Sequence, residues 1–357
     1  METNNNENLL WADIVKILSI FAVILIHSSA PLLLRYGSEN TAWWIGNVYD
    51  SIARWCIPLF VMMSGMFLIS KMHEQSVSDF FRKRARRILL PFILWSFIYM
   101  LWRIHINNEN LSLLSFFSLF FTEPLYYHLW FMYLIAGLYL LTPIISIYLK
   151  NAERENIMYF LVLWFMAGSV LPTVESLFNI RTYLSTGTSN SIFKFLGYFV
   201  LGYALRDVRL RPPKLILSIF VFMLGFLITA YGTYILTMRQ DPGTFDETFY
   251  EYFSFNVFLM AASVYLIGKS IKFPDFLLNF EKKKELFHTA AACVPGIYLI
   301  HAMMIEISKK GLLGFTFSQD TLHPAIGVPA FALGIFFSSL IVVLTVKKIP
   351  GLRYLFP

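Results

Sequence analysis

Residues 9–32 read LLWADIVKILSIFAVILIHSSAPL, an apolar run long enough to cross a lipid bilayer as one α-helix. Asp13, Lys16 and His27 interrupt this run, and ionisable side chains inside a membrane helix are costly and usually functional. Lys16 and His27 are separated by 11 positions, which returns them to nearly the same helix face about 16 Å apart along the axis. One face of the predicted helix therefore carries functional groups toward both sides of the membrane.

The rest of the chain shares the apolar composition of this run. Of its 357 residues, 57% are hydrophobic and only 14% are charged, whereas a soluble domain has roughly a quarter of its residues charged. The lipid bilayer is therefore the expected partner of most of the surface. A net charge of +7 would indicate an anionic partner for a soluble protein, but here it is explained by charges placed relative to the membrane, so we expect no nucleic-acid partner.

Apolar windows of about 20 residues predict an all-α polytopic integral membrane protein with about ten transmembrane helices. The stretch Leu111–Phe121 is also apolar but too short to cross, so we expect an interfacial or re-entrant segment there. No internal repeat is evident, and residues 1–357 are expected to form a single membrane domain without an appended soluble domain. The predicted spans are residues 9–32, 48–70, 88–106, 127–149, 156–175, 190–206, 213–237, 250–269, 287–308 and 325–346.

Basic residues are concentrated in alternate predicted loops. Lys and Arg are enriched on the cytoplasmic side of membrane proteins, so these loops are expected to be cytoplasmic and, with ten crossings, both termini as well. The set comprises 20 of the 29 basic residues, namely Lys71, Arg82, Lys83, Arg84, Arg86, Arg87, Lys150, Arg154, Arg206, Arg209, Arg211, Lys214, Lys269, Lys272, Lys282, Lys283, Lys284, Lys347, Lys348 and Arg353.

Several small residues are predicted to have structural roles. Gly197 and Gly202 lie five positions apart in a predicted span, where glycine usually allows close helix packing rather than ligand binding. Cys56 and Cys293 lie inside apolar runs with no spacing typical of a disulfide framework or a metal site. We therefore expect both cysteines to be small buried hydrophobic residues.

Arg54, His128 and His301 are expected in the outer half of the membrane, at about the depth of His27. A neutral imidazole can take a proton from a hydroxyl and return one to a leaving group, and a nearby arginine favours a developing oxyanion. The alternative is that each histidine only hydrogen-bonds a neighbouring helix. Zinc is a further use of clustered histidines, but the sequence has no HExxH motif and no i,i+4 histidine pair, so no metal is expected.

A basic run, FFRKRARRILLP, occupies residues 80–91 before the third predicted span. One interpretation is that it only sets topology and attracts anionic headgroups. The other is that Arg84 and Arg87, at i and i+3 on one helical face, bind a phosphorylated ligand at the membrane surface. The sequence alone supports both interpretations.

These motifs together resemble the membrane-bound acyltransferase 3 family of cell-envelope O-acyltransferases, from about residue 11 to residue 305. The family's first-helix pattern of a basic residue, ten others and histidine matches Lys16 to His27, and its RxxR pattern matches Arg84-Ala-Arg-Arg87. The segment RWCIPLFVMMSG at 54–65 resembles its second-helix motif. The segments YHLWF at 127–131 and GIYLIHA at 296–302 resemble most closely the members that O-acetylate enterobacterial common antigen.

The resemblance implies a bacterial inner-membrane enzyme that uses acetyl-CoA, or another acyl-CoA, as a cytoplasmic acyl donor. The acceptor would be a hydroxyl of an extracytoplasmic glycan or polyprenyl-linked saccharide. Within this assignment the base would be His27, the oxyanion would be stabilised by Arg54 or His301, and an acyl-histidine intermediate is an alternative. The implied catalytic residues are His27, Asp13, Arg54 and His301, the implied acyl-CoA-binding residues are Lys16, Arg84 and Arg87, and the implied acceptor-binding residues are His128, Trp130 and Tyr298.

Two other classes of membrane protein share some of these features. A transporter or flippase for a small polar solute or a lipid-linked glycan would also carry intramembrane charges and broken helices. A non-catalytic scaffold would not need Lys16 and His27 on one helix face. The enzyme is predicted to cleave an acyl-CoA thioester, whereas a transporter would move its solute without thioester chemistry.

Overall fold

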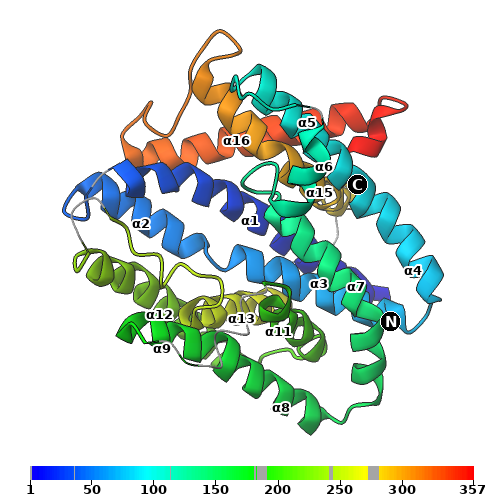
Figure 1. The fold of residues 1–357 in the computed structure, drawn as a ribbon. Coiled ribbons are helices and arrows are strands. Elements are labelled where there is room, and N and C mark those ends of the chain that lie inside the picture. Colours follow the sequence, from blue (N-terminus) through cyan, green and yellow to red (C-terminus); the bar gives the residue numbers. More distant parts are fainter. Residues whose placement is uncertain are drawn as a thin grey trace.

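The computed structural model describes residues 2–35, 37–112, 114–180, 182, 191–240, 244–271 and 281–357. These residues form helices joined by turns and loops, and no strand occurs among them. Figure 1 places the N-terminus and the C-terminus at the same end of the bundle, which is also the end of the basic helix α4. The prediction of an all-α fold is confirmed.

Eight helical segments of the described chain are long and apolar enough to cross a membrane, so the protein is a multi-pass membrane protein. They comprise α1 (Glu2–Arg35), α2 (Thr41–Ala53) with α3 (Cys56–Met72), α4 (Val77–Arg84) with the π-helix η1 (Ala85–Leu89) and α5 (Leu90–His105), α7 (Trp130–Asn151), α8 (Arg154–Phe165) with the π-helix η2 (Met166–Val170) and α9 (Leu171–Phe178), α12 (Pro212–Thr237), α15 (Glu281–Lys310) and α16 (Pro324–Lys347). The other described elements are α6 (Ser115–Thr122), α11 (Ser191–Ala204), α13 (Phe255–Ser270) and the 3-10 helix η3 (Leu352–Leu355).

The shorter helices correspond to three predicted segments. Two of the ten predicted spans, 190–206 and 250–269, form the short apolar helices α11 and α13. The predicted non-crossing stretch forms α6, whose Phe117 and Phe121 are exposed. Lys272, one of the residues in the predicted cytoplasmic set, lies outside the described residues.

Two helices begin earlier than predicted, at N-cap residues that precede the apolar windows. The second span begins at Thr41, since the side chain of Asn40 accepts a hydrogen bond from a backbone N–H of the first turn. The basic run before the third span is helical from Val77, where Ser76 caps α4 in the same way. Hydropathy windows detect apolar residues and not caps, so both predicted boundaries were wrong.

The second predicted span was expected to be one helix, and this was wrong. It breaks at Arg54 and Trp55, between α2 and α3. Pro58 follows four residues after Arg54, and a proline can neither donate to nor fit against the carbonyl group at i−4. The helical ladder therefore resumes only with the bond from the N–H of Leu59 to the carbonyl of Trp55. The break therefore places Arg54 between two helices, outside a regular helical ladder, in the interior of the molecule.

Helix α1 lies at the centre of the bundle, where it contacts α2, α3, α13, α15 and α16 (Figure 1). Next to it, α3 and α11 pack closely through Gly65 and Gly202. A Cβ atom on Gly65 would overlap the carbonyl of Phe199, and one on Gly202 would overlap the carbonyl of Met62. The predicted packing role of Gly202 is therefore confirmed, as is the prediction that both cysteines are free and buried.

Candidate active site

Three histidines from three separate segments meet beside α1. The ring of His27 in α1 stacks on the ring of His301 in α15, with centroids 5.4 Å apart and planes at 26°. The ring of His128, in the turn before α7, lies 4.9 Å from that of His301 in an edge contact. His128 and His301 are buried and His27 is half-buried. The structure therefore brings together the three histidines that were predicted to share one depth.

Hydrogen bonds hold two of these histidines in place. Nδ1 of His301 donates to the backbone carbonyl of Tyr298, 2.6 Å away, because a carbonyl can only accept. The hydroxyl of Tyr298 in turn donates to the backbone carbonyl of His128. Nε2 of His301 and both ring nitrogens of His128 are buried and meet no hydrogen-bond partner in the described part of the chain. In neutral His301 the lone pair therefore lies on Nε2, where it can accept a proton.

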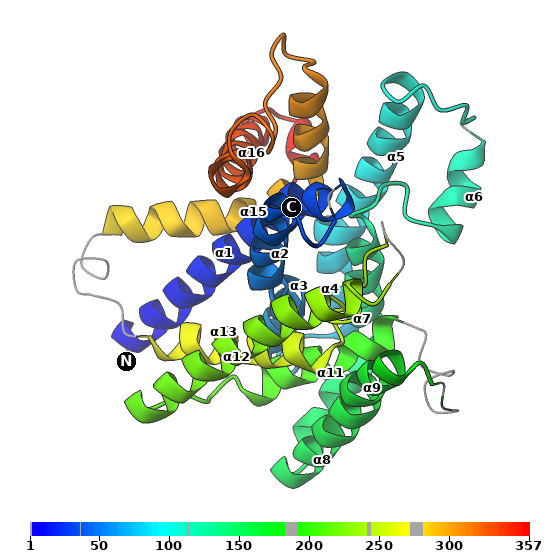
Figure 2. The ribbon, with the colours of Figure 1, turned by 90° about the vertical axis from the view of Figure 1, so that its left-hand side faces the viewer.

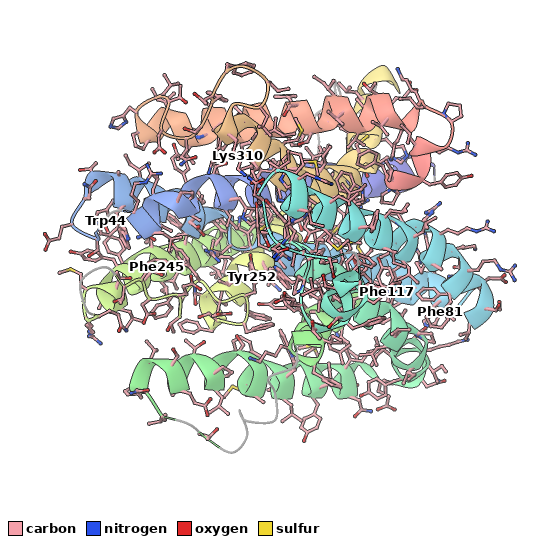
Figure 3. All side chains as sticks on the ribbon, turned by 45° about the horizontal axis from the view of Figure 1, so that its top comes forward. Trp44, Phe81, Phe117, Phe245, Tyr252 and Lys310 are labelled. Atoms are coloured by element: carbon pink, nitrogen blue, oxygen red, sulfur yellow. The ribbon has the colours of Figure 1, made fainter. Side chains whose placement is uncertain are left out.

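Arg54 occupies the break between α2 and α3. Its Nε donates to Oδ1 of the buried Asp50 over 2.5 Å, and its Nη1 donates to the carbonyl of Tyr250 over 3.3 Å. The guanidinium also lies 4.1 Å from the ring centroid of Tyr250 and 6.0 Å from that of Tyr252, which is labelled in Figure 3. Its positive charge acts electrostatically on His27. Arg54 is thus a fixed cation at the edge of the histidine cluster.

A carboxylate network borders the cluster on its other side. Glu306 in α15 accepts hydrogen bonds from the hydroxyl of Tyr126 at 2.5 Å and from the indole of Trp102 at 2.7 Å, and it pairs with Lys310 at 2.7 Å. Burial and the bond to Glu306 raise the pKa of Tyr126 well above its usual value, so its phenol remains a donor. The Tyr126 ring lies 5.8 Å from that of His128.

Asp13 and Lys16 lie at the other end of α1, and the structure does not bring them to the histidines. Asp13 is about 21 Å from His27 along the helix axis. Its two carboxylate oxygens pair with Lys16 at 3.4 Å and with His288 at 3.0 Å. Nζ of Lys16 also lies 5.0 Å from the ring centroid of Phe67. A direct role for Asp13 at the reacting atoms is therefore not supported by its position.

Arg84 and Arg87 are close enough to repel each other but have different surroundings. Arg84 is half-buried between the rings of Phe80 and Tyr139, whose centroids lie 5.3 and 5.8 Å from its guanidinium, while Arg87 is exposed. The π-helix η1 begins between them, so their spacing differs from that of a regular α-helix. The two arginines are therefore not part of one regular α-helix.

An apolar cavity of about 140 Å³ lies beside ring neighbours of Arg84 and of His128. Tyr139, whose ring contacts Arg84, lines it together with Ile88, and Tyr298, whose ring lies 5.5 Å from that of His128, also lines it. The remaining walls are mainly apolar side chains of α3, α7 and α15. The cavity thus links the basic end of the bundle to the histidine cluster.

A family model described as an acyltransferase domain matches residues 9–347. The chain belongs to the acyltransferase 3 family. Its activity is therefore that of an acyltransferase, in agreement with the prediction from the motifs. No curated protein and no solved structure gives a significant match to this acyltransferase.

Trp130, predicted to bind the acceptor, shares the neighbour Tyr252 with Arg54 in this acyltransferase. Its ring stacks on that of Tyr252 at 5.9 Å and lies 6.0 Å from that of Phe195. The same residue lines a cavity of about 300 Å³ formed with Glu123, other residues near α6, and the start of α7. Among the described residues, no group of three or more His, Cys, Asp or Glu side chains has an arrangement that could hold a metal ion.

Asp50 and Glu306 are site residues of the acyltransferase that the motif analysis missed. Both are ionisable residues inside predicted spans, which is the signal that identified Asp13, Lys16 and His27 in the first helix. Asp50 also stands at i−4 from Arg54, the spacing of a helical ion pair. Applied to every span, the same criterion would have found both carboxylates.

Proposed function

We propose that this acyltransferase transfers an acetyl group from cytoplasmic acetyl-CoA to a hydroxyl of a glycan or polyprenyl-linked saccharide on the opposite side of the bacterial inner membrane. The observation that carries the proposal is the packing of His27, His128 and His301 beside Tyr298, which lines an apolar cavity together with Tyr139, a ring neighbour of Arg84. The distribution of basic residues supports cytoplasmic termini. The motifs at 127–131 and 296–302 favour the subgroup that O-acetylates enterobacterial common antigen.

The donor would bind from the end of the bundle that holds the basic residues. Arg84 and Arg87 would contact its phosphates, and Lys16, which is held by Asp13, would add a third positive charge. The acyl-pantetheine arm is a flexible chain, and the apolar cavity past Tyr139 and Tyr298 offers it a path. This path runs between α3, α7 and α15 and not along the open face of α1.

His27 would act as general base toward the acceptor hydroxyl. As its ring takes the hydroxyl proton, the acceptor oxygen forms a bond to the thioester carbonyl carbon, giving a tetrahedral oxyanion. Collapse of this intermediate breaks the carbon–sulfur bond, and the protonated imidazole returns the proton to the leaving thiolate. The products are the acetyl ester and free coenzyme A.

Arg54 is better suited than neutral His301 to stabilise the oxyanion. The proton of neutral His301 is on Nδ1 and is used by the Tyr298 carbonyl, so the ring has no donor left for an oxyanion. Arg54 uses Nε and Nη1 for Asp50 and Tyr250, and no described residue bonds its Nη2. A fixed guanidinium group costs little reorganisation during the reaction.

The acceptor would reach the histidines from the end of the bundle where α6 lies. Trp130 and Glu123 line the cavity of about 300 Å³ there, and an aromatic ring beside a carboxylate is a common surface for sugar rings and their hydroxyls. Tyr298 would keep His128 in position through the bond to its carbonyl. His128, with two unpartnered ring nitrogens, would hydrogen-bond the acceptor.

The test is release of free thiol from acetyl-CoA by the purified protein in proteoliposomes supplied with an envelope-glycan extract. Removal of the base in His27→Ala is expected to lower the rate by about 10²- to 10⁴-fold. Replacement of both phosphate-binding arginines in Arg84→Gln/Arg87→Gln is expected to raise the donor concentration for half-maximal rate. His105→Ala is the matched control, because His105 is exposed at the end of α5.

Undiminished thiol release by His27→Ala would overturn the proposed mechanism. Absence of thioester cleavage by the native protein with every acyl-CoA and acceptor extract would overturn the proposed reaction. A solute-flux assay on the same proteoliposomes then tests the transporter alternative, for which His27→Ala should stop movement of the solute without any change in thiol.

A further inference from the structure

A second cavity, of about 600 Å³, lies near the N-terminal end of α1. Its walls come from Trp11 in α1, from residues 66–71 at the end of α3, from residues 206–209 after α11, and from Lys269 near the end of α13. Figure 2 shows α13 beside the first part of α1, and the two helices are in contact. The volume is in the range of small-molecule sites in proteins, roughly 300 to 1,000 Å³.

The lining of this cavity is strongly basic. Lys71, Arg206, Arg209 and Lys269 contribute four positive charges, and Asp207 contributes the single negative charge. Asp207 is already paired with Nε of Arg206 at 3.2 Å. The cavity therefore favours an anionic ligand.

Lys269 distinguishes this cavity from an ordinary basic cytoplasmic surface. Only 8% of the residue is exposed, and its Nζ lies 5.3 Å from the ring centroid of Trp11. Within the described ranges, no carboxylate lies within ion-pair distance of this Nζ, although Asp207 acts on it electrostatically. The side chain is thus mostly buried, and its ammonium group reaches the cavity without a bonded carboxylate. A ligand oxygen in the cavity would supply the missing partner.

The cavity is separate from the Arg84 site but adjoins Lys16. Lys16 lies over the ring of Phe67, and Phe67 lines this cavity, whereas Arg84 contacts Tyr139, which lines the smaller apolar cavity. Trp11, Met66 and Phe67 add apolar and aromatic surface next to the cations. Cations beside aromatic rings suit phosphate groups attached to an organic moiety.

We propose that the cavity lined by Trp11, Arg206 and Lys269 binds the phosphate groups of an organic phosphate ligand. Two sources share this chemistry. One is the nucleotide end of the acyl donor, an assignment that rests on the proposed function, and the other is the headgroup of an anionic phospholipid. In either case Lys269 and Arg206 contact phosphate oxygens, and Lys71 lies at the exposed rim.

The experiment measures binding and not catalysis, so it is independent of acyl transfer. The full chain in zwitterionic nanodiscs is titrated with adenosine 3′,5′-bisphosphate, and lipids retained after purification in anionic nanodiscs are quantified by native mass spectrometry. The variants are Lys269→Gln in the cavity, Lys71→Gln at its rim and Arg84→Gln outside it. Lys150→Gln is the control, because Lys150 is an exposed lysine at the end of α7.

A nucleotide source predicts that Lys269→Gln weakens bisphosphate binding at least tenfold and Lys71→Gln weakens it less, with Lys150→Gln unchanged. A lipid source predicts that Lys269→Gln and Lys71→Gln leave bisphosphate binding unchanged while Lys269→Gln loses retained anionic lipid. The proposal is overturned if neither Lys269→Gln nor Lys71→Gln changes either signal in protein that remains folded. Loss of bisphosphate binding in Arg84→Gln alone, with retained anionic lipid unchanged in Lys269→Gln, would also overturn it, while leaving the proposed function intact.

Discussion

Removal of the Asp50 carboxylate should destabilise the acyltransferase more than most single substitutions, because it leaves a largely buried guanidinium unpaired. The side chain of Asp50 is fully buried, that of Arg54 is 16% exposed, and their bond is 2.5 Å long. Truncating one member of a buried ion pair costs about 3 to 5 kcal/mol. This is a large share of a typical unfolding free energy of roughly 5 to 15 kcal/mol.

The size of the effect should depend on what replaces the carboxylate. Asp50→Asn keeps an acceptor for Nε of Arg54 but removes the charge, so the expected loss is about 1 to 2 kcal/mol, the difference between charged and neutral hydrogen bonds. Asp50→Ala should lose about 3 to 5 kcal/mol, and the double variant Asp50→Ala/Arg54→Ala should lose less than the sum of the single changes.

The assay is unfolding of the purified protein in mixed micelles as the fraction of denaturing detergent rises, followed by circular dichroism. Thiol release from acetyl-CoA is measured on the same samples, and Asp50→Asn should lower the rate because Arg54 is no longer fixed beside His27. If Asp50→Ala unfolds with the native midpoint, or if the two alanine substitutions are strictly additive, the pair is not the structural unit described above.

Three further substitutions test neighbouring parts of the structure. Gly202→Ala should cost about 1 to 3 kcal/mol in the same unfolding assay, since its Cβ would overlap the Met62 carbonyl, and a native midpoint would contradict the close packing. Tyr298→Phe removes the hydroxyl that holds the His128 carbonyl and should slow thiol release about fivefold, the equivalent of one hydrogen bond. Glu306→Gln should lower the melting temperature, and an unchanged value would show that its three partners do not need the charge.

Composition and periodicity were sufficient to predict the all-α membrane fold and to group three histidines that the structure brings together. The position of a residue within an apolar window gives its height in the membrane, which is why His27, His128 and His301 could be expected at one level. Height does not give the lateral order of helices, because that order depends on contacts between distant segments. The sequence therefore grouped Lys16 with Arg84, whereas the structure places them beside different rings and different cavities.

Local backbone changes were the second feature that hydropathy could not predict. The break at Arg54 follows from Pro58, whose effect was visible in the sequence but was outweighed by the apolar character of the window. The π-helix at Ala85–Leu89 contains no residue type that specifies it. Each irregularity changes the direction of an arginine that belongs to the candidate site, and such positions are where local rules and function commonly conflict.

The cavity sizes explain how one bundle could join two aqueous sides without forming a pore. The cavity between Tyr139 and Tyr298 holds about 140 Å³, less than a typical ligand site, so it suits a narrow chain and not a nucleotide or a sugar ring. The wide cavities, of about 600 and 300 Å³, lie among cations at one end and near Trp130 at the other. In the proposed reaction the donor's phosphates and the acceptor thus remain on opposite sides of the membrane, and only the acyl-bearing arm enters the apolar interior. The narrow cavity around this arm would keep water away from the thioester.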